Sequence, residues 1–432
     1  MLDETTTPLP LREAAAPLPA DSPASSPRKT VWLTRLLVVG LVLAAVNLRP
    51  AITSLGALLE DVRVGLHMSG SVAGVLTSVP ALCFAVFGVT APRLARRFGP
   101  ATVVCAGLVA ITAGLLIRPF TSGTAAFLAA SALALMGIAV GNVLMPVIVK
   151  RYFPDRVGTM TGLYSMALSA GTAVAAAATV PMTSALGGSW RLGLGLWAVV
   201  AAVAVLPWAA LLVRDRKVAG RRPEPEQASA SASAVARAAG PRIARSRTAW
   251  ALGCFFGLQA TGAYITMGWM PQIFRDAGVS AGTAGLLLAV TMVMGVPLAF
   301  VIPRLATRMK NQGPIVVALG ACGLTGYTGL FLAPAAGAWV WAVLLGVSNC
   351  AFPLALTMIG MRARTGAGVV RLSAFAQSTG YLISIPGPLL VGVLYQHSGG
   401  WGLPITLMAG LMVPQIILGV VAGRDRTIED EC

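Results

Sequence analysis

The stretch Asn47-Leu48-Arg49-Pro50 places a cation beside a helix break inside a long apolar run. The run extends from about residue 31 to residue 59, which is long enough to cross a bilayer as a helix. A guanidinium costs about 2.5–3.5 kcal/mol at the centre of a membrane helix, so it is tolerated where it faces a polar cavity or a partner. Pro50 has no N–H, so the carbonyl of Val46 loses its helical partner and the helix can bend. Arg49 is therefore the first candidate for a solute-binding group.

The alternative for Arg49 is structural: its side chain would reach outward along the helix or pair with Glu60 or Asp61. We favour solute binding, because ionisable residues inside membrane spans usually mark functional sites. Arg49 is the only charged residue that we place well inside a span. Its planar fork of donors would attract a small anion or a strongly polar group such as a nitro oxygen.

Two neighbours of Arg49 are candidates for the same site. On a helix, Thr53 lies one turn further along and shares a face with Arg49. Asn47 lies two residues back, on a different face unless Pro50 distorts the turn. Asn47 is therefore either a solute ligand or a residue that satisfies backbone groups.

The composition is that of a membrane protein that crosses the bilayer many times. Of the 432 residues, 56% are hydrophobic and 11% are charged, whereas soluble proteins carry about 25% charged residues. The six cysteines have no paired spacing, and the two histidines, His67 and His397, fall in short loops. We expect no disulfide framework, no metal site and no cofactor.

The apolar runs predict an all-α protein of twelve transmembrane helices. Residues 1–30, rich in Pro, Ala, Ser and Thr, are expected to form a disordered cytoplasmic tail. The expected spans are 33–56, 71–91, 101–119, 124–149, 157–181, 190–213, 248–270, 281–302, 314–334, 337–360, 369–394 and 401–423.

Basic residues alternate between the loops and so predict the topology. The two termini and every second loop hold 27 of the 32 Lys and Arg residues, and the opposite loops hold only Arg63, Arg118, Arg191 and Arg275. The positive-inside rule then places both termini in the cytoplasm, with the chain in the plasma or inner membrane of the cell. The net charge of +17 is explained by this topology, so we do not expect nucleic acid as a partner.

The chain divides into two halves joined by a linker. Residues 214–247 are basic and low in complexity, and we interpret them as a flexible cytoplasmic linker. They separate a six-helix half at 31–213 from a six-helix half at 248–423, and residues 424–432 are expected to form a cytoplasmic tail.

The two halves resemble each other. Ser69–Leu76 matches Ser280–Leu287, and Pro92–Arg97 matches Pro303–Arg308, both at an offset of 211 residues. Trp190 and Trp401 have the same offset, and Asn142–Pro146 matches Asn349–Pro353 at an offset of 207. Four matches in order, with six spans on each side, indicate a parallel duplication and hence two pseudo-symmetric halves.

These features resemble the major facilitator superfamily over about residues 31–423. Within it, Asn47–Pro50 followed by Leu58-Leu59, and the loop Ala91–Arg97, look like the cyanate/2-nitroimidazole transporter family. The chain departs from the superfamily loop signature where Arg96, not an acid, follows Leu94-Ala95, so that loop lacks the acid of its usual salt bridge. The resemblance implies a central cavity lined by spans one, four, seven and ten, and a carrier that works as a monomer.

Further polar residues in the spans are candidates for that cavity. Asn142 with Pro146, and Asn349 with Pro353, are related by the repeat; either they face solute or each Asn bonds a neighbouring helix. Span seven carries Gln259 and Tyr264, and span eleven carries Gln377 and Tyr381 within a polar stripe of i, i+4 spacing. We assign these four side chains to the cavity, with interhelical hydrogen bonding as the alternative.

The predicted function is secondary active transport by alternating access. The fifteen acids fall in tails, loops or span ends, so the membrane acid that cation exporters generally need is missing. The solute is predicted to be a small anion or a polar nitrogenous compound, cyanate-like or nitro, that is taken up with Arg49 in the site. The alternative is efflux of a small neutral or anionic drug-like molecule. An enzyme would need clustered acids, histidines or an activated nucleophile, and the sequence offers none.

Overall fold

The computed structural model describes residues 27–219 and 243–431, and within these ranges every regular element is helical. Most of the expected tail at 1–30 and of the expected linker at 214–247 lies outside the described residues. The N-terminal half contains α1 Pro27–Val46, α2 Pro50–Ala57, α3 Leu59–Gly65, α4 Gly70–Phe98, α5 Pro100–Ile117, η1 Arg118–Phe120, α6 Thr124–Tyr152, η2 Pro154–Arg156, α7 Val157–Ala185 and α8 Trp190–Ala219.

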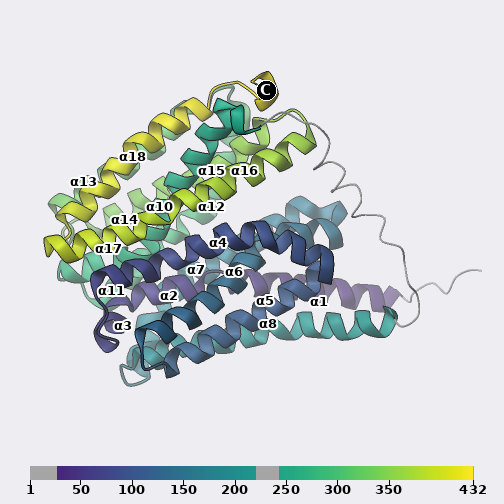
Figure 1. Ribbon diagram of the computed structural model, residues 1–432, viewed down its shortest axis with the longest axis horizontal. Coiled ribbons are helices and arrows are strands. Elements are labelled where there is room, and N and C mark those ends of the chain that lie inside the picture. Colours follow the sequence, from purple (N-terminus) through teal and green to yellow (C-terminus); the bar gives the residue numbers. More distant parts are fainter. Residues whose placement is uncertain (1–26, 220–242, 432) are drawn as a thin grey trace, which may run out of the picture.

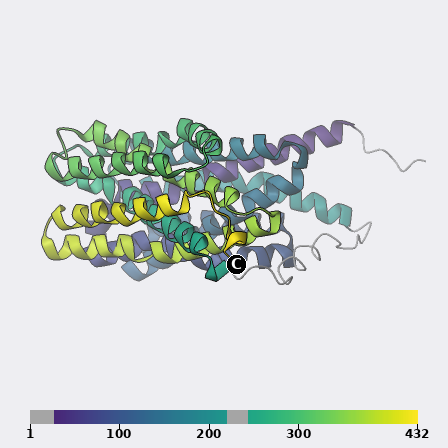
Figure 2. The same ribbon diagram turned by 90° about the horizontal axis from the view of Figure 1, so that it is seen from above.

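The C-terminal half repeats this plan with more interruptions. It contains η3 Ile243–Arg245, α10 Arg247–Asp276, α11 Ala281–Val293, α12 Gly295–Arg308, α13 Gly313–Leu332, α14 Ala338–Ser348, α15 Ala351–Met361, α16 Gly366–Ser384, α17 Pro386–Ser398, α18 Gly402–Ala422 and η4 Ile428–Asp430. The two halves form separate bundles that lie against each other in Figure 1, and Figure 2 shows the helices of both running along a common axis.

The predicted spans are confirmed with one qualification. Eleven helices, or pairs of helices joined at a break, are long and apolar enough to cross a membrane within the described residues. The remaining span is α10, which is 30 residues long but is not one of the eleven. Its polar residues are shielded from lipid, because Gln259, Thr261, Thr266 and Gln272 are all buried.

Proline sets the positions where several spans break. α1 and α2 are separated at Asn47–Arg49, just before Pro50, and α16 and α17 are separated at Ile385, just before Pro386. A proline lacks the N–H that would continue the helical ladder. Pro146, by contrast, lies inside the continuous helix α6, so a proline permits a break without forcing one.

Residues 424–431, from the segment 424–432 that was expected to be a tail, fold back onto the C-terminal half. The Glu431 carboxylate accepts hydrogen bonds from the Ser246 hydroxyl (2.7 Å) and from the backbone N–H (2.9 Å) and hydroxyl (2.8 Å) of Thr248. Glu429 accepts from the backbone N–H groups of Arg364 and Thr365. The Glu431 carboxylate caps the start of α10, where helix N–H groups lack partners, and Glu429 holds the two residues that precede α16. We call Thr427–Glu431 the C-terminal clamp.

Candidate solute-binding site

The helix break around Arg49 leaves a backbone carbonyl without its helical partner, next to the cation. Arg49 has φ −132° and ψ −28° as the N-cap of α2, outside helical geometry. The Val46 carbonyl, which Pro50 leaves without its helical donor, packs against Gly171 of α7. A Cβ at Gly171 would lie 2.2 Å from that oxygen. Glycine is therefore needed there, because any side chain would push α7 away from the break.

Arg49 faces tyrosines of the other half. The Tyr264 hydroxyl on α10 lies within hydrogen-bonding reach of the Arg49 guanidinium. Tyr381 on α16 is close enough to Arg49 to interact with its charge. Both tyrosines come from the C-terminal half, while Arg49 comes from the first span of the N-terminal half. The interface between the halves thus brings together three of the residues that the sequence assigns to the cavity.

Aromatic rings surround this cluster. Phe84 on α4 stacks on Tyr381, with ring centroids 5.0 Å apart and planes at 25°, and lies 6.3 Å from Tyr264. Phe256 on α10 meets Tyr381 edge-on, with centroids 5.3 Å apart. Nothing in the sequence distinguishes Phe84 or Phe256, because an aromatic residue in a span carries no signal that separates core from cavity. The rings exclude water and so strengthen the field of Arg49.

Gln259 and Asn349 meet at a second helix break. The Gln259 side-chain amide donates to the Asn349 backbone carbonyl at 3.0 Å, where α14 ends and α15 has not yet begun. The repeat-related Asn142 lies inside α6 instead, and its amide donates to the Ile138 carbonyl of the same helix at 3.0 Å. The two asparagines, matched in sequence, therefore differ in structure.

The other three candidates bond to nearby groups. The Asn47 amide donates to the carbonyls of Leu43 (2.8 Å) and Val200 (3.3 Å), which is the backbone role left open above. The Thr53 hydroxyl donates to the Arg49 carbonyl at 3.3 Å, and the Gln377 amide donates to the Ser373 hydroxyl at 2.6 Å. These contacts position the helix break and α16, and they leave Arg49 and the tyrosines as the groups that face one another.

The structure is nearly closed on the α3 side of this cluster. A cavity of about 10 Å³, lined by Ala51, Leu76, Tyr264 and Gly268 among others, lies there. That volume is about one water molecule. Beside it the Trp269 indole of the C-terminal half donates to the Thr77 hydroxyl of the N-terminal half at 3.1 Å. A solute at Arg49 would not pass this side without a movement of the two halves.

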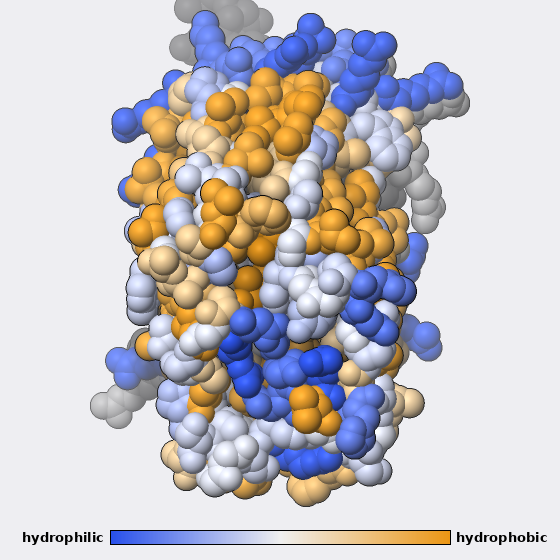
Figure 3. All heavy atoms as spheres, turned by 90° about the vertical axis from the view of Figure 1, so that its left-hand side faces the viewer, coloured by the Kyte–Doolittle hydropathy of each residue, from blue (hydrophilic) through white to orange (hydrophobic). Residues whose placement is uncertain are grey.

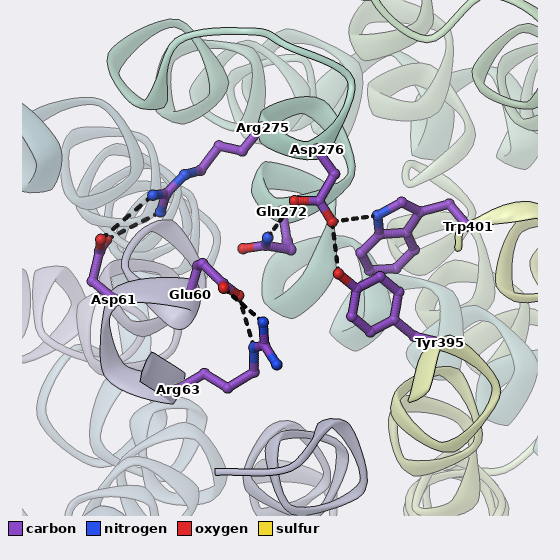
Figure 4. A network of polar contacts seen from close by, with 8 residues as sticks. All are labelled: Glu60, Asp61, Arg63, Gln272, Arg275, Asp276, Tyr395 and Trp401. Atoms are coloured by element: carbon purple, nitrogen blue, oxygen red, sulfur yellow. Dashed lines mark hydrogen bonds and ion pairs between the residues drawn. The ribbon is translucent and has the colours of Figure 1, made fainter. Parts of the chain in front are cut away.

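A polar network seals the α3 end (Figure 4). Asp61 pairs with Arg275 of the other half at 3.0 Å, and Glu60 pairs with Arg63 at 2.6 Å. The hydrogen bonds that Arg63 donates to the Glu60 carboxylate raise the pKa of Arg63. In Figure 3, which faces this end, hydrophilic residues gather in the lower middle below a hydrophobic expanse. Glu60 and Asp61 have other partners, so neither is the counter-ion that the structural alternative proposed for Arg49.

Arg49 is not the only cation deep in the protein. Arg118, expected in a loop, begins η1 and is fully buried, with a relative exposure of 0%. It belongs to an apolar span that reaches Phe120. Its place at the end of a span agrees with the sequence, because η1 connects α5 to α6, but the sequence did not predict that its side chain is buried. Only the packing of η1 against neighbouring helices encloses it.

Comparison with known proteins gives the family of this chain. Residues 36–384 match the family model described as Major Facilitator Superfamily. This chain belongs to the major facilitator superfamily. The twelve-span, two-half expectation is therefore correct, and major facilitator members are multi-pass membrane transporters of the cell membrane that carry small-molecule solutes.

Individual members share most of their length with this chain. The 2-nitroimidazole transporter of Escherichia coli strain K12 is 32% identical over 91% of this chain and 96% of its own. The cyanate transport protein CynX of the same strain is 29% identical over 87% of this chain and 95% of its own. The solved nucleoside transporter NupG superposes with a TM-score of 0.71 at 15% identity, covering 90% of this chain and 98% of its own. That last likeness concerns the fold alone.

Proposed function

We propose that this transporter is a secondary active carrier that takes up a small anion or a small polar nitrogenous compound, with Arg49 as the solute-binding charge. One observation carries the proposal: a guanidinium at a helix break faces Tyr264 and Tyr381 across the interface between the halves. None of the four ion pairs among the described residues involves Arg49. A cation held there without a carboxylate is a site for a negative or strongly polar solute.

The arrangement around Arg49 suits a compact, planar solute. The guanidinium offers parallel N–H donors, the Tyr264 hydroxyl adds a donor, and Phe84 and Tyr381 offer ring faces. Cyanate and a nitroimidazole both present an electronegative end and a flat, poorly hydrated body. The names of the two Escherichia coli relatives support this substrate class.

Transport would follow from rocking the halves about Arg49. The basic-loop rule puts the α3 end outside the cell and both termini inside. The closed network at Asp61 and Arg275 then belongs to a state that is shut toward the outside. Because Arg49 belongs to one half and its tyrosines to the other, separating the halves at the α3 end would uncover the solute site from outside.

Thermal unfolding of the purified protein with a ligand panel tests the proposal. The panel holds cyanate, nitrate, short carboxylates, nitroimidazoles and cationic drugs. A ligand at 100 times its Kd stabilises by about 2.7 kcal/mol. We expect anions or nitro compounds to stabilise wild type and not Arg49→Gln. Arg304→Gln, which removes an exposed charge on α12, is the matched control and should behave as wild type.

Uptake into proteoliposomes then follows with the ligand that stabilises most. We expect Arg49→Gln to abolish saturable uptake while Arg304→Gln retains it. Stabilisation by cationic or bulky apolar drugs alone, equal in wild type and Arg49→Gln, would reject the Arg49 site and favour efflux.

A further inference from the structure

Arg118 is a second buried cation, separate from the solute site. Its relative exposure is 0%. Its Nη1 donates to the Ala51 carbonyl across a long 3.4 Å, and its Cζ lies 5.3 Å from the ring centre of Phe127. Its Nε and Nη2 groups have no hydrogen-bond partner. Most of the donor capacity of this guanidinium is therefore unused.

The described residues supply no counter-charge for Arg118. Of the acids at this end, Glu60 is paired with Arg63 and Asp61 with Arg275. Arg191, the nearby cation, donates to the carbonyls of Pro119 and Thr121 at 2.7 Å each, which adds positive charge to the same loop. A buried ion without a partner of opposite charge is strongly destabilising. A water molecule would satisfy its N–H groups but not its charge.

Two buried hydroxyls on the helices that Arg118 contacts are also without partners. Ser54 lies on α2, one turn after Ala51, and Ser131 lies on α6, one turn after Phe127. Ala51 and Phe127 are the residues that Arg118 itself contacts. Both hydroxyls are fully buried and make no hydrogen bond. Buried polar groups are nearly always hydrogen-bonded, so unpartnered groups on Arg118 and on both helices that it contacts point to a missing ligand.

The packing of α5 against α6 places Arg118 beside one turn of α6. Gly114, one turn before Arg118, lies so close to α6 that a Cβ there would be 2.6 Å from the Ala130 carbonyl. Arg118 therefore leaves α5 beside the Phe127–Ser131 turn of α6. α2 lies on the other side, through the Ala51 contact. The three elements that carry the guanidinium and the two hydroxyls thus meet at Arg118.

We propose that Arg118, Ser54 and Ser131 form a binding site for a small monovalent anion inside the N-terminal half. The anion would accept hydrogen bonds from Nε and Nη2 of Arg118 and from the two hydroxyls. The bound charge neutralises the guanidinium, and the apolar wall at Phe127 limits the site to an ion of halide or cyanate size. This site does not depend on the Arg49 proposal, because it lies within one half and not between the two.

Bromide in crystals of the full-length protein gives the direct test. Bromide stands in for a small monovalent anion and is located by its anomalous scattering. We expect an anomalous peak in contact with the Arg118 guanidinium and the Ser131 hydroxyl. Ordered density for water there, with no bromide peak at high bromide concentration, overturns the proposal.

Thermal unfolding gives the solution test, with chloride or with gluconate, which is too large for the site. We expect chloride to stabilise wild type in a saturable way. Ser131→Ala should weaken the apparent affinity about tenfold or more, as expected for one lost hydrogen bond to a charge. Ser78→Ala is the matched control, because Ser78 is equally buried and unpartnered. It lies one turn beyond Gly74, which packs against Leu389 of the other half. An equal chloride response in wild type, Ser131→Ala and Arg118→Met overturns the proposal.

Competition identifies the source of the anion. If cyanate displaces bromide from the site, the transported anion itself visits Arg118. If chloride binds and cyanate does not compete, the site holds a resident halide. Arg49→Gln should keep the chloride response in either case, so failure of this site and failure of the solute site are distinguishable.

Discussion

The carboxylate of Asp61 lies 3.0 Å from the guanidinium of Arg275, and this ion pair joins the N-terminal half to the C-terminal half. One residue earlier, Glu60 pairs with Arg63 inside α3. The two adjacent acids thus make one contact between the halves and one within a half (Figure 4). This difference supplies a matched pair of variants for the closure of the α3 end.

Asp61→Asn is expected to shift the protein toward the state open at the α3 end. Partly exposed ion pairs contribute about 0.2–1 kcal/mol, so the ratio of open to closed states should rise at most about fivefold. Spin labels on α3 and on the start of α11 would report the distance between the halves. Glu60→Gln should leave that distribution unchanged. An equal shift in both variants would contradict the assignment.

Gly56→Ala should open the same end by steric means. A Cβ at Gly56 would lie 2.0 Å from the Met267 carbonyl of the other half. Overpacking of this kind costs about 1–3 kcal/mol, and opening the α3 end would relieve it. Gly114→Ala is the comparison, because its Cβ would meet Ala130 within the N-terminal half. We expect Gly114→Ala to lower the melting temperature without changing the inter-half distance, and the reverse result would refute the mechanism.

Tyr264→Phe should weaken solute binding while the protein stays folded. The substitution removes the hydroxyl that faces Arg49, and a hydrogen bond to a charged group contributes about 1.5–3 kcal/mol. The Kd of the best anion from the panel should rise about tenfold or more, measured by isothermal titration. Tyr327→Phe removes a buried hydroxyl that lies near Thr266 instead. Its Kd should match wild type, and equal losses in both variants would remove Tyr264 from the site.

The C-terminal clamp should make stability depend on pH. Burial raises the pKa of Glu431, but hydrogen bonds from Ser246 and Thr248 outweigh it, so the net pKa is lowered from 4.5. A carboxylate with a lowered folded pKa stabilises the protein above its unfolded pKa, and this contribution disappears as pH falls through the folded value. Glu431→Gln should therefore melt below wild type at pH 7, and the gap should close as pH falls below 4.5.

The control for the clamp is Asp155→Asn, which removes an exposed carboxylate from η2. Its melting curve should follow wild type across the same pH range. A gap between wild type and Glu431→Gln that stays constant down to pH 3.5 would show that the clamp acts without its charge.

Local chemistry explains what the sequence could predict. The break at Arg49–Pro50 follows from a missing N–H, and eleven of the twelve spans follow from apolar length. The sequence assigned Arg49, Tyr264 and Tyr381 to one cavity. It did not predict that they lie next to one another, because that depends on how the halves pack. The role of Asn47 was left open, and its amide donates to two backbone carbonyls.

Contacts between residues that lie far apart in the chain explain what the sequence did not reveal. From the sequence, Arg118 is predicted to lie in a loop. Its burial depends on contacts with Phe127 of the next helix and with Ala51, which lies far from it in sequence. The sequence of the C-terminal clamp predicts a short acidic tail. Its contacts with Ser246 span 185 residues, and no local pattern indicates them.

The polarity of α10 has a consequence for how the chain enters the membrane during synthesis. A span that carries buried Gln259, Thr261, Thr266 and Gln272 gains little from contact with lipid, so the translocation machinery has a weak signal to release it sideways. Its partners α16 and α18, and the clamp that caps its first turn, are all made later. We therefore expect α10 to stay at the translocation site until those helices emerge, so that the C-terminal half assembles as a group and not one helix at a time.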